Sequence, residues 1–459
     1  MDYRQFFAGL NGKKIAVCGV GVSNTPLIFK LLKYGAQVVA CDRRTREQIG
    51  DIANELEVAG AQLKLGDGYL DNLDVDIIFR TPGMKFNLPE LDAARERGIV
   101  VTSEMEVFFD LCPARIFAIT GSDGKTTTTT IIAKMLEAEG KKVFVGGNIG
   151  TPLLPKIEEI KADDFVVVEL SSFQLISMRQ SPDVAVVTNV EPNHLDVHKD
   201  MDEYVDAKKN VLMHQNAFSR TVLNRDNGIT ETFRNDVRGE NIGFSMIRKL
   251  QNGAWLDDGG ILHMTHNGVD TPIINRKEIK IFGDHNVANY LTAIAAVWGY
   301  VSVENICKVA RDFGGVEHRI EFVREKDGVK YYNNSIASSP TRTIAGLKAF
   351  DQKVILIAGG YDKNIPFEPM MPYLVEKVKT LYLCGDTADK IEKCLREYGG
   401  YYGKPEIIRV KNIDEAVKRA HETAVSGDIV TLSPACASFD AYPNFVVRGN
   451  HFKKLVNEL

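Results

Sequence analysis

Short runs of apolar and β-branched residues alternate with helix-length segments along almost the whole chain. This alternation predicts parallel sheets joined by crossover helices, and therefore an α/β fold. The runs fall into three groups, and 459 residues are too many to bury around one hydrophobic core. We therefore expect three domains, which span residues 1–112, 113–314 and 315–459.

The strand-like runs place these boundaries. The first group covers 13–20, 36–42 and 75–81, the second 115–121, 141–147, 164–170 and 184–190, and the third 329–335, 353–360, 380–385 and 428–434. One boundary falls near 112, before Pro113, and the other near 314. Residues 240–283 differ from these groups, and within them GAWLDDGGILHMTHNGVDTPI, residues 253–273, contains Asp-Gly and Asn-Gly turns that predict hairpins.

The composition argues against several classes of protein. A net charge of −5 disfavours a general nucleic-acid binder, which carries a basic face. No apolar run approaches the ~18 residues of a membrane span, and the N-terminus lacks the pattern of a signal peptide, so no membrane insertion is expected. The seven cysteines are scattered without a C-x-x-C pair, which favours reduced thiols and a cytoplasmic location.

The stretch ITGSDGKTTTTT, residues 119–130, has the composition of a phosphate-binding loop. Its two glycines permit the tight bend that turns backbone amides inward, Lys125 supplies a point charge, and the Thr126 hydroxyl suits magnesium. The threonines begin a helix whose N-terminus attracts anions. The loop is shorter than G-x-x-x-x-G-K-[ST], because Ile119 occupies the place of the first glycine. The alternative is a threonine-rich helix start beside one exposed lysine.

Two other glycine-rich turns follow strand-like runs. AVCGVGVSNTP, residues 16–26, resembles a dinucleotide fingerprint with Asp42 as the ribose-binding acid, but Asn24 replaces its third glycine. A turn without a ligand explains this stretch as well. KVILIAGGYDKNIPF, residues 353–367, places Lys363 at the edge of a sheet where ligands bind, although a solvated turn is the better explanation of this stretch alone.

Together these motifs resemble those of the Mur ligases, which build the peptide of bacterial peptidoglycan. TGSDGKTT is similar to their shortened loop, T-G-[ST]-[ND]-G-K-[ST]-[ST]. Further matches follow in order: GGNIGTP (146–152), ELSSFQL (169–175), NVEPNHLDVH (189–198), HNVANYLTA (285–293), EHR (317–319) and LSPACASFDAYPNF (432–445). The resemblance covers essentially the whole chain. ELSSFQL and SPACASFD are most similar to the branch that joins D-glutamate to UDP-N-acetylmuramoyl-L-alanine.

The resemblance implies a fold and a reaction. It implies a Rossmann-like N-terminal domain that binds the UDP-sugar, a central P-loop ATPase-type domain with a parallel sheet, and a Rossmann-like C-terminal domain that binds the amino acid and part of ATP. ATP would phosphorylate the substrate carboxylate and D-glutamate would attack the acyl phosphate, as in an ATP-dependent acid–amino acid ligase. Two Mg²⁺ ions would assist. The partners would be these small molecules without nucleic acid, and the protein would be a monomer.

The resemblance also implies a catalytic and metal site. The catalytic residues would be Lys125, Glu169, His194 and Lys208, and the metal ligands Thr126, Glu169, His194 and Lys208. Lys208 would be carbamylated, because an ammonium cannot bind magnesium whereas an anionic carbamate can. The neighbouring Lys209 leaves the assignment open by one residue, although the family spacing Y-x-x-A-K favours Lys208. Without the motifs that surround them, Glu169, His194 and Lys208 would each be interpreted as an ordinary surface or structural side chain.

The substrate-binding residues follow in the same way from the resemblance. ATP would contact Gly121, Ser122, Asp123, Gly124, Lys125, Thr126, Thr127, Asn286, Asn289, Arg319 and Asn334. The UDP-sugar would contact Val22, Ser23, Arg43, Arg44, Gly83, Asn148 and Ser171. D-Glutamate would contact Ser338, Lys363, Ser438 and Phe445. The UDP-sugar assignment replaces the dinucleotide interpretation of residues 16–26.

One segment departs from the family pattern, which is commonly N-D-S-K-A-[TS]-N where this chain has NNSIASS at 333–339. Asn334 replaces an aspartate and Ile336 replaces a lysine. Asparagine keeps hydrogen bonds but lacks the charge, so we expect weaker ATP binding or a changed metal dependence.

Three alternative functions remain. Another Mur-type or folylpolyglutamate-type amide ligase is disfavoured by SPACASFD and by the short first domain. A non-catalytic nucleotide-sugar-binding homologue would usually have lost some of the catalytic residues. A plain P-loop kinase is disfavoured because the matches continue to the C-terminus.

Overall fold

The computed structural model describes residues 2–191, 198–363 and 365–459. The chain divides into two compact units, of which the first runs up to Ile279 and includes His285–Arg311. The second unit consists of Lys280–Asp284 and Asp312–Leu459. Among the described residues, the strands form three sheets whose pairs are mostly parallel, which confirms the predicted α/β class.

The N-terminal sheet has the strand order β3-β2-β1-β4-β5, and all its pairs are parallel. Its strands are β1 Lys14–Cys18, β2 Gln37–Asp42, β3 Gln62–Leu65, β4 Ile77–Arg80 and β5 Val100–Ser103. The helices of this region are α1 Tyr3–Ala8, α2 Thr25–Lys33, α3 Arg46–Ile49, α4 Asp51–Val58, α5 Pro89–Glu96 and α6 Glu104–Leu111. The order reverses between β1 and β4, and the loops that follow such strands form the usual ligand crevice.

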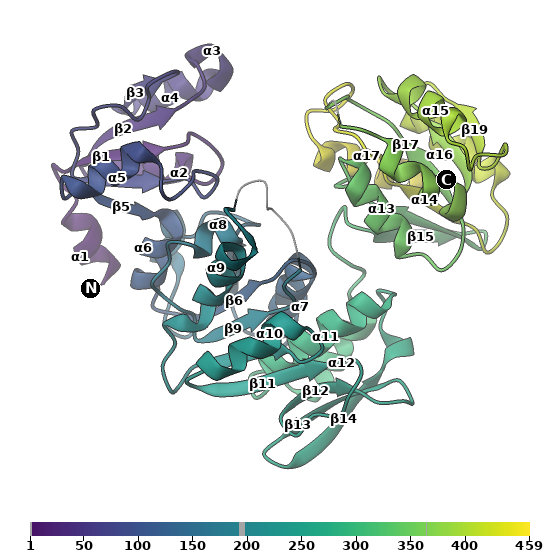
Figure 1. The fold of residues 1–459 in the computed structure, drawn as a ribbon, viewed down its shortest axis with the longest axis horizontal. Coiled ribbons are helices and arrows are strands. Elements are labelled where there is room, and N and C mark those ends of the chain that lie inside the picture. Colours follow the sequence, from purple (N-terminus) through teal and green to yellow (C-terminus); the bar gives the residue numbers. More distant parts are fainter. Residues whose placement is uncertain (1, 192–197, 364) are drawn as a thin grey trace. The chain divides into compact units, whose positions relative to one another are not determined.

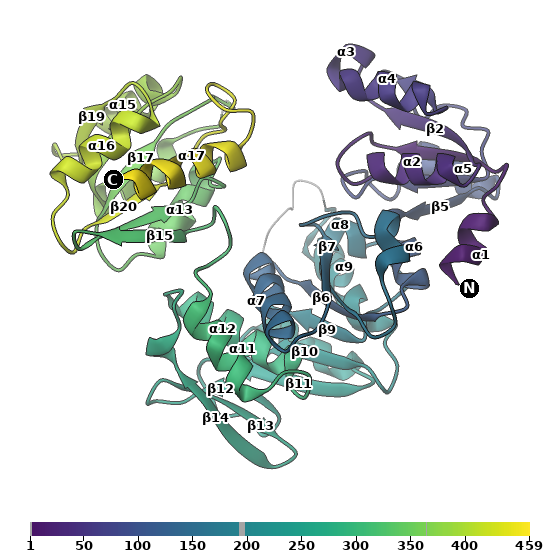
Figure 2. The same ribbon diagram turned by 180° about the vertical axis from the view of Figure 1, so that it is seen from behind.

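The central sheet has the order β14-β13-β12-β11-β10-β9-β6-β8-β7. Its strands are β6 Arg115–Thr120, β7 Val143–Gly147, β8 Phe165–Glu169, β9 Val184–Val187, β10 Arg220–Asn224, β11 Glu240–Ser245, β12 Gly253–Leu256, β13 Ile261–His266 and β14 Val269–Asn275. Its α-helices are α7 Lys125–Ala138, α8 Ser172–Leu175, α9 Met201–Met213, α10 Gly228–Thr232, α11 Asp284–Val297 and α12 Val303–Asp312. Short 3₁₀ helices are η1 Leu154–Glu159, η2 Phe233–Asp236 and η3 Arg276–Glu278. Helices α7 and α11 lie side by side (Figures 1 and 2).

The segment 240–283 contains hairpins only in its second half. β12, β13 and β14 are antiparallel, and Figure 1 shows β13 and β14 as a projecting hairpin. Asn267 and Gly268 have φ of 51° and 77°, as a tight two-residue hairpin turn requires. β11 instead pairs parallel with β10, because α10 and η2 carry the chain back across the sheet, and β12 is parallel to β11. The hairpins predicted for residues 253–273 are therefore confirmed.

The N-terminal and central sheets share one hydrophobic cluster, which includes Val17 of β1 and Val166 of β8. Polar contacts also join these two regions. Lys30 in α2 donates to Glu158 and to the carbonyl of Pro155 in η1, at 2.9 Å each. The first unit is therefore continuous across both sheets.

Glu104 is a buried carboxylate at the start of α6 that accepts hydrogen bonds from the backbone amides of Leu153 and Leu154, at 3.0 and 2.6 Å. Burial outweighs these two hydrogen bonds and raises the pKa of Glu104 from 4.5 to about 7. The folded protein therefore holds this proton more tightly than the unfolded chain. The stability from this group is fully present below pH 4.5 and is lost as the pH rises through about 7.

We expect Glu104→Gln to abolish this pH dependence, because glutamine still accepts from both amides and cannot ionise. The free energy of unfolding of the wild type, relative to the variant, should fall by ~3 kcal/mol between about pH 5 and 8. Denaturant unfolding at both pH values measures the difference. Parallel pH profiles for the two proteins would contradict the assignment.

The sheet of the second unit has the order β15-β16-β20-β17-β18-β19, in which only β15 is antiparallel to its neighbour. Its strands are β15 Glu321–Lys326, β16 Val329–Asn333, β17 Val354–Ala358, β18 Val378–Leu383, β19 Glu406–Arg409 and β20 Ile429–Leu432. The helices are α13 Pro340–Lys348, η4 Glu368–Met370, α14 Met371–Lys377, α15 Ala388–Glu397, α16 Ile413–Thr423 and α17 Phe445–Glu458.

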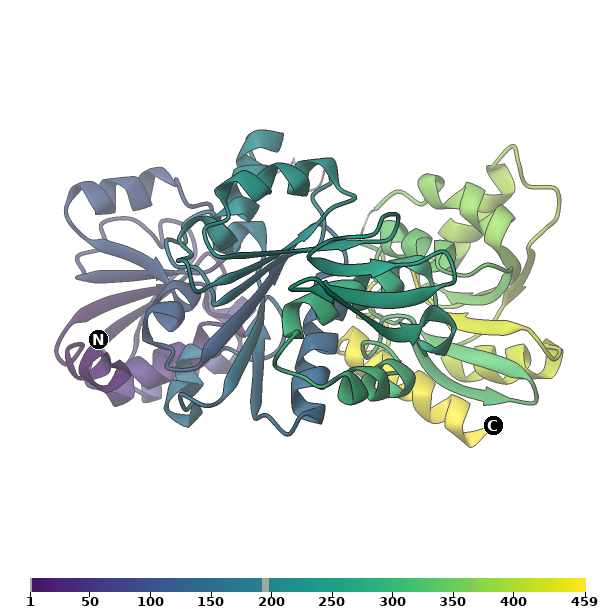
Figure 3. The same ribbon diagram turned by 90° about the horizontal axis from the view of Figure 1, so that it is seen from below.

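Two separate hydrophobic clusters cover the faces of this sheet. One contains Leu347 of α13 and Leu374 of α14, and the other contains Val417 of α16 and Phe452 of α17. Figure 3 shows α17 in yellow, ending at the C-terminus. No helix in the described part of the chain is long and apolar enough to cross a membrane.

Candidate active site

The loop between β6 and α7 has the predicted geometry of a tight bend followed by a helix N-terminus. Gly121 has φ of 149° and Gly124 has φ of 78°, which favour glycine. A Cβ at Gly124 would also collide with the side-chain oxygen of Asn289. Helix α7 begins at Lys125, so its free amides face the loop as they do in anion-binding sites.

Thr188 and Asn189, which directly follow β9, fix the conformation of this loop by hydrogen bonds. Neither was among the residues predicted from the sequence. Asn189 accepts from the amide of Asp123 through its side-chain oxygen at 2.9 Å, and its own carbonyl accepts from the amide of Ser122 at 2.9 Å. The Thr188 hydroxyl donates to the carbonyl of Asp123 at 2.6 Å. The NVEPNH motif contained this signal, but only its histidine had an obvious chemical role.

Lys125 lies against its own loop. Its ammonium donates to the carbonyls of Gly121 and Ser122, at 3.0 Å each. A flexible lysine stem lets the ammonium exchange such carbonyls for the oxygens of a bound phosphate.

Glu169 ends β8 and is 2% exposed. The Thr126 hydroxyl donates to one of its carboxylate oxygens at 2.7 Å, and the Asn148 amide donates to the other at 2.8 Å. The structure thus brings together a predicted metal-ligand pair and a predicted substrate contact. A carboxylate and a hydroxyl beside a phosphate loop are hard oxygen donors of the kind that Mg²⁺ prefers.

Lys208 in α9 is 2% exposed, and its ammonium donates to the carbonyl of Gly121 at 2.7 Å. Burial, and then the nearby charge of Lys125, lower the pKa of Lys208 to about 7. A large fraction of this side chain is therefore a neutral amine near pH 7. Lys209 points elsewhere, because it forms an ion pair with Asp236 at 2.6 Å.

Tyr204 connects α9 to the phosphate loop a second time. Its hydroxyl lies 3.0 Å from the hydroxyl of Ser122, which also donates to the carbonyl of Glu191. Tyr204, Ala207 and Lys208 are all buried, so the Y-x-x-A-K spacing corresponds to one inward face of α9.

His194 lies within 192–197, outside the described residues. His198, just beyond them, contacts the hydroxyl of Ser172 at 2.9 Å and the carboxylate of Glu203 at 3.1 Å. It thereby links α8, which follows Glu169, to α9, which carries Lys208. No cluster of three or more histidine, cysteine, aspartate or glutamate side chains suited to a metal occurs among the residues that are described.

Asn286 and Asn289, predicted to contact ATP, lie in α11. The side-chain oxygen of Asn289 accepts from the Thr128 hydroxyl at 3.2 Å, and its amide donates to Asn286 at 3.2 Å. Asn289 therefore contacts the helix that begins at the phosphate loop. The remaining predicted residue of α7, Thr127, is half-buried in the first turn.

Five of the seven predicted UDP-sugar residues follow β1, β2 and β4 of the N-terminal sheet, whose strand order reverses between β1 and β4. The other two, Asn148 and Ser171, follow β7 and β8 of the central sheet. Val22 is 82% exposed, and Arg43 and Gly83 are exposed. Ser23 and Arg44 are half-buried, and Ser171 caps the N-terminus of α8. Asp42 accepts from the amide of Val20 at 2.8 Å and pairs with Arg44 at 2.9 Å, so it fixes the loop of β1.

The other predicted residues belong to the second unit. Arg319 lies between His318 and Ile320, whose φ values of 63° and 46° are unusual for residues other than glycine. Asn334 is buried, donates to the Ser433 hydroxyl at 2.9 Å and accepts from the amide of Ile320 at 3.3 Å. The predicted D-glutamate residues differ in exposure: Ser438 is buried, Ser338 and Phe445 are half-buried, and Lys363 is exposed.

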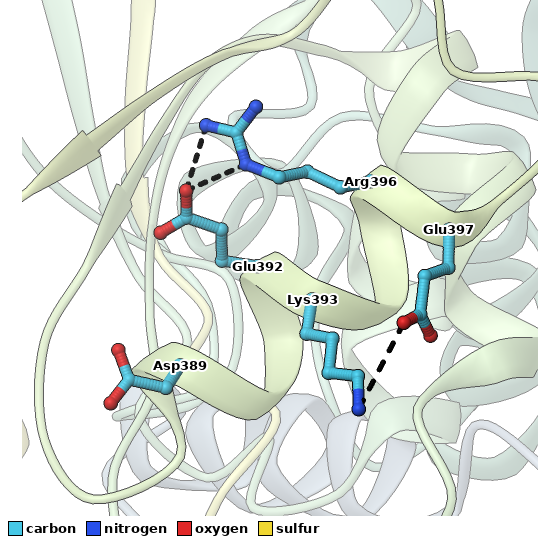
Figure 4. A pocket seen from close by; sticks show the side chains of 5 residues that line it. All are labelled: Asp389, Glu392, Lys393, Arg396 and Glu397. Carbon is cyan, nitrogen blue, oxygen red and sulfur yellow. Dashed lines mark hydrogen bonds and ion pairs between the residues drawn. The ribbon is translucent and has the colours of Figure 1, made fainter.

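A surface depression of about 380 Å³ lies along α15, lined by Asp389, Glu392, Lys393, Arg396 and Glu397 (Figure 4). Its charges are paired with one another or with Arg409: Arg396 contacts Glu392 at 2.7 Å and Lys393 contacts Glu397 at 3.9 Å. None of its residues is a predicted site residue. The depression is therefore an ion-paired surface, not the candidate active site.

Comparisons with known proteins identify the family of the chain. The Mur ligase middle domain matches residues 119–297, and the Mur ligase glutamate ligase domain matches residues 318–436. The chain is 51% and 52% identical to the UDP-N-acetylmuramoylalanine–D-glutamate ligases of Clostridium botulinum strains Hall and Alaska E43, and each alignment covers 100% of this chain and 99% of the relative.

Solved structures show the same fold at low identity. UDP-N-acetylmuramate-alanine ligase from Thermotoga maritima is 17% identical with a TM-score of 0.56, over 97% of this chain and 99% of that one. A UDP-N-acetylmuramoyl-L-alanyl-D-glutamate–2,6-diaminopimelate ligase is 16% identical with a TM-score of 0.56, over 92% and 93%. Because the full-length relatives are about half identical, this chain belongs to the Mur ligase family.

Proposed function

We propose that the protein is an ATP-dependent ligase that joins D-glutamate to UDP-N-acetylmuramoyl-L-alanine, a cytoplasmic step of peptidoglycan synthesis. One observation carries the proposal: relatives about half identical over the full chain have this activity in their names. The grouping of Lys125, Glu169 and Lys208 around the phosphate loop supports it, because a non-catalytic homologue has no need to keep them.

The chemistry explains why ATP is needed. A carboxylate does not expel oxide, so an amine cannot displace it directly. A carboxylate oxygen of the UDP-sugar substrate therefore attacks the γ-phosphorus, and ADP leaves. The amine of D-glutamate then attacks the acyl carbon, phosphate leaves, and the nitrogen loses a proton to give the amide. The protein's task is mainly to position anionic reactants and to neutralise their charge.

Residues at the loop and around it have separate roles in this scheme. Lys125 and the amides at the start of α7 bind the phosphates of ATP. Mur ligases depend on ATP and use Mg²⁺, and the converging oxygens of Thr126 and Glu169 fit that ion. When bound, Mg²⁺ would screen the charges of triphosphate and carboxylate. We propose two ions, held by Thr126, Glu169, His194 and a carbamate on Lys208.

Substrate binding would be divided among three domains, 1–112, 113–314 and 315–459, which correspond to the three sheets. Val22, Ser23, Arg43, Arg44 and Gly83 would bind the UDP part. Asn148 and Ser171 would bind nearer the reacting carboxylate. In the second unit, the D-glutamate residues would be Ser338, Lys363, Ser438 and Phe445, while Arg319 and Asn334 would contribute to ATP binding.

The location and oligomeric state are also proposals. All seven cysteines lie in the described part of the chain and are free, which suits a reducing compartment that supplies ATP. We expect a monomer, which light scattering would test.

The central experiment measures phosphate release from ATP with UDP-N-acetylmuramoyl-L-alanine present, with and without D-glutamate. We expect release that depends on both substrates, and an amide product identified by mass spectrometry. Replacement of D-glutamate by L-alanine or L-lysine, and of the UDP-sugar by folate, should abolish it. Release that depends on neither substrate would refute the proposal, and activity with a replacement would favour another amide ligase.

A further inference from the structure

Arg448 in α17 is a buried arginine that has no role in the reaction proposed for the site. It is 2% exposed, and its guanidinium donates four hydrogen bonds. Nε and Nη2 donate to the hydroxyl and the carbonyl of Ser335, at 3.0 and 2.9 Å. Nη1 donates to the carbonyl of Ala437 at 2.9 Å, and Nη2 also donates to the carbonyl of Cys436 at 3.1 Å. All four acceptors are uncharged.

These acceptors belong to separate loops at the same end of the sheet. Ser335 follows β16, whereas Cys436 and Ala437 follow β20. Gly360, after β17, packs so closely that a Cβ there would lie 3.3 Å from Nη1 of Arg448. The neighbouring amide of Tyr361 donates to the carbonyl of Ala437 at 3.1 Å. One guanidinium thus hydrogen-bonds the loops after β16 and β20 and packs against the loop after β17.

The four predicted D-glutamate residues all lie close to this network in the chain. Ser438 follows Ala437 directly, Ser338 is three residues beyond Ser335, and Lys363 is three residues beyond Gly360. The carbonyl of Phe445 accepts from the Ser335 hydroxyl at 2.8 Å, so it is bound through the same serine that Arg448 contacts. The loops that carry these residues therefore depend on one side chain for their relative positions.

The burial of this cation has a cost that ordinary packing does not require. A buried charge whose hydrogen bonds go to uncharged acceptors recovers its lost hydration only in part, and the nearby charge of Asp440 offsets some of that cost. Burial accordingly lowers the pKa of Arg448 to about 10, which leaves the guanidinium charged at neutral pH. The planar group presents five donors in a fixed arrangement, so it can hold several carbonyls in one geometry as lysine cannot.

We propose that Arg448 is the positioning residue of the amino-acid site, which fixes the loops after β16, β17 and β20 so that they bind D-glutamate. The inference rests on the proposed function. The four hydrogen bonds of Arg448 all go to residues of the second unit, and Arg448 is not assigned a role in ATP or UDP-sugar binding. Its loss should therefore affect the second half of the reaction selectively.

Arg448→Lys tests this, because lysine keeps the charge but offers its donors at one point. We expect the KM for D-glutamate to rise about 10-fold or more, because each lost hydrogen bond comes from a charged donor and is therefore stronger than a neutral one. The matched control is Arg324→Lys. Arg324 also donates to backbone carbonyls of α17, those of Val456 and Asn457 at 3.3 and 2.9 Å, but at the far end of the helix. Its KM for D-glutamate should not change.

Hydroxylamine separates a positioning role from general damage. This small nucleophile attacks an acyl phosphate to give a hydroxamate and inorganic phosphate, and it needs no amino-acid site. We expect Arg448→Lys to keep hydroxylamine-dependent ADP release at the wild-type rate while its D-glutamate saturation curve shifts. Equal losses with both nucleophiles, or an unchanged KM for D-glutamate, would overturn the proposal.

A second variant covers the case in which Arg448→Lys does not fold. Ser335→Ala removes the hydroxyl between Arg448 and the carbonyl of Phe445 with little change of volume. It should raise the KM for D-glutamate several-fold, and an unchanged KM would count against the proposal. The wild-type enzyme separates the two failures. Absence of D-glutamate-dependent turnover there refutes the proposed function and this role with it, whereas wild-type turnover with an unchanged KM in both variants refutes only the role of Arg448.

Discussion

Lys208→Ala is expected to lower kcat by about 10³-fold, because it removes an anionic ligand that the proposed metal site requires. The structure places this side chain in the right environment for carbamylation. It is 2% exposed, its nitrogen lies 2.7 Å from the carbonyl of Gly121, and burial lowers its pKa to about 7. Only the neutral amine attacks carbon dioxide, so a lysine with the usual pKa would react far more slowly.

Lys209→Ala is the matched control for this experiment. The two lysines are adjacent in α9, but Lys209 pairs with Asp236 at 2.6 Å and does not contact the phosphate loop through any described hydrogen bond. Its replacement should leave kcat within about twofold, as is usual for surface substitutions. A carbon-13 carbamate signal in labelled bicarbonate should disappear in Lys208→Ala and persist in Lys209→Ala.

Chemical rescue tests the charge itself. Lys208→Ala leaves a space beside Gly121 that a short carboxylic acid, such as acetate or propionate, can enter. We expect the added carboxylate to restore part of the activity, and the corresponding alcohol to restore none. A fully active Lys208→Ala enzyme, or rescue by the alcohol as well, would rule out the carbamate.

Local pattern was sufficient to predict the elements that carry the site. The apolar runs 115–121 and 164–170 correspond to β6 and β8, and the threonine run corresponds to the start of α7. Each of these patterns lies within a few consecutive residues and can therefore be recognised in the sequence. Strands β3 and β5 were not predicted, since each has only four residues and lies at a sheet edge. Such short segments owe their conformation to the neighbouring strand more than to their own sequence.

The sequence predicted those site residues whose side chains have a distinctive chemistry. It did not predict residues whose role is to form hydrogen bonds with the backbone of other segments. Thr188, Asn189 and Arg448 mainly bind amides or carbonyls of other segments. Their roles depend on which loops the fold brings together, and no spacing along the chain records that. Six of the functional residues predicted from the resemblance lie in the second unit, and the family pattern selected them all, although Lys363 also stood out by its place at a sheet edge.

Asn334 illustrates how the structure changes an interpretation. The sequence suggested a lost charge in the ATP site. The side chain instead uses its donor on Ser433 and its acceptor on the amide of Ile320, next to Arg319. An aspartate could accept from Ile320 but could not donate to Ser433, and it would be a buried charge. The amide therefore suits this position as a link between the Arg319 turn and the loop after β20.

Glu169→Gln is expected to lower kcat by about 10²- to 10³-fold and to raise the Mg²⁺ concentration needed for half-maximal activity. The substitution keeps size and shape, but it replaces one of two converging carboxylate oxygens by a donor. Asn148 can still donate to the remaining oxygen, and the Thr126 hydroxyl can rotate to accept from the new amide. The fold should thus persist while the charge that attracts the metal is lost.

Glu104→Gln provides the matched control, because it is another isosteric change of a buried carboxylate in the first unit, joined to backbone amides rather than to the phosphate loop. Both variants should unfold cooperatively, but only Glu169→Gln should lose activity and shift its Mg²⁺ dependence. Whether the Mg²⁺ concentration for half-maximal activity shifts at all separates a metal ligand from a residue that only orients its neighbours. If Glu169 served only to orient Thr126 and Asn148, kcat would fall at every Mg²⁺ concentration with an unchanged half-saturation point, and the assignment of Glu169 as a metal ligand would have to be withdrawn.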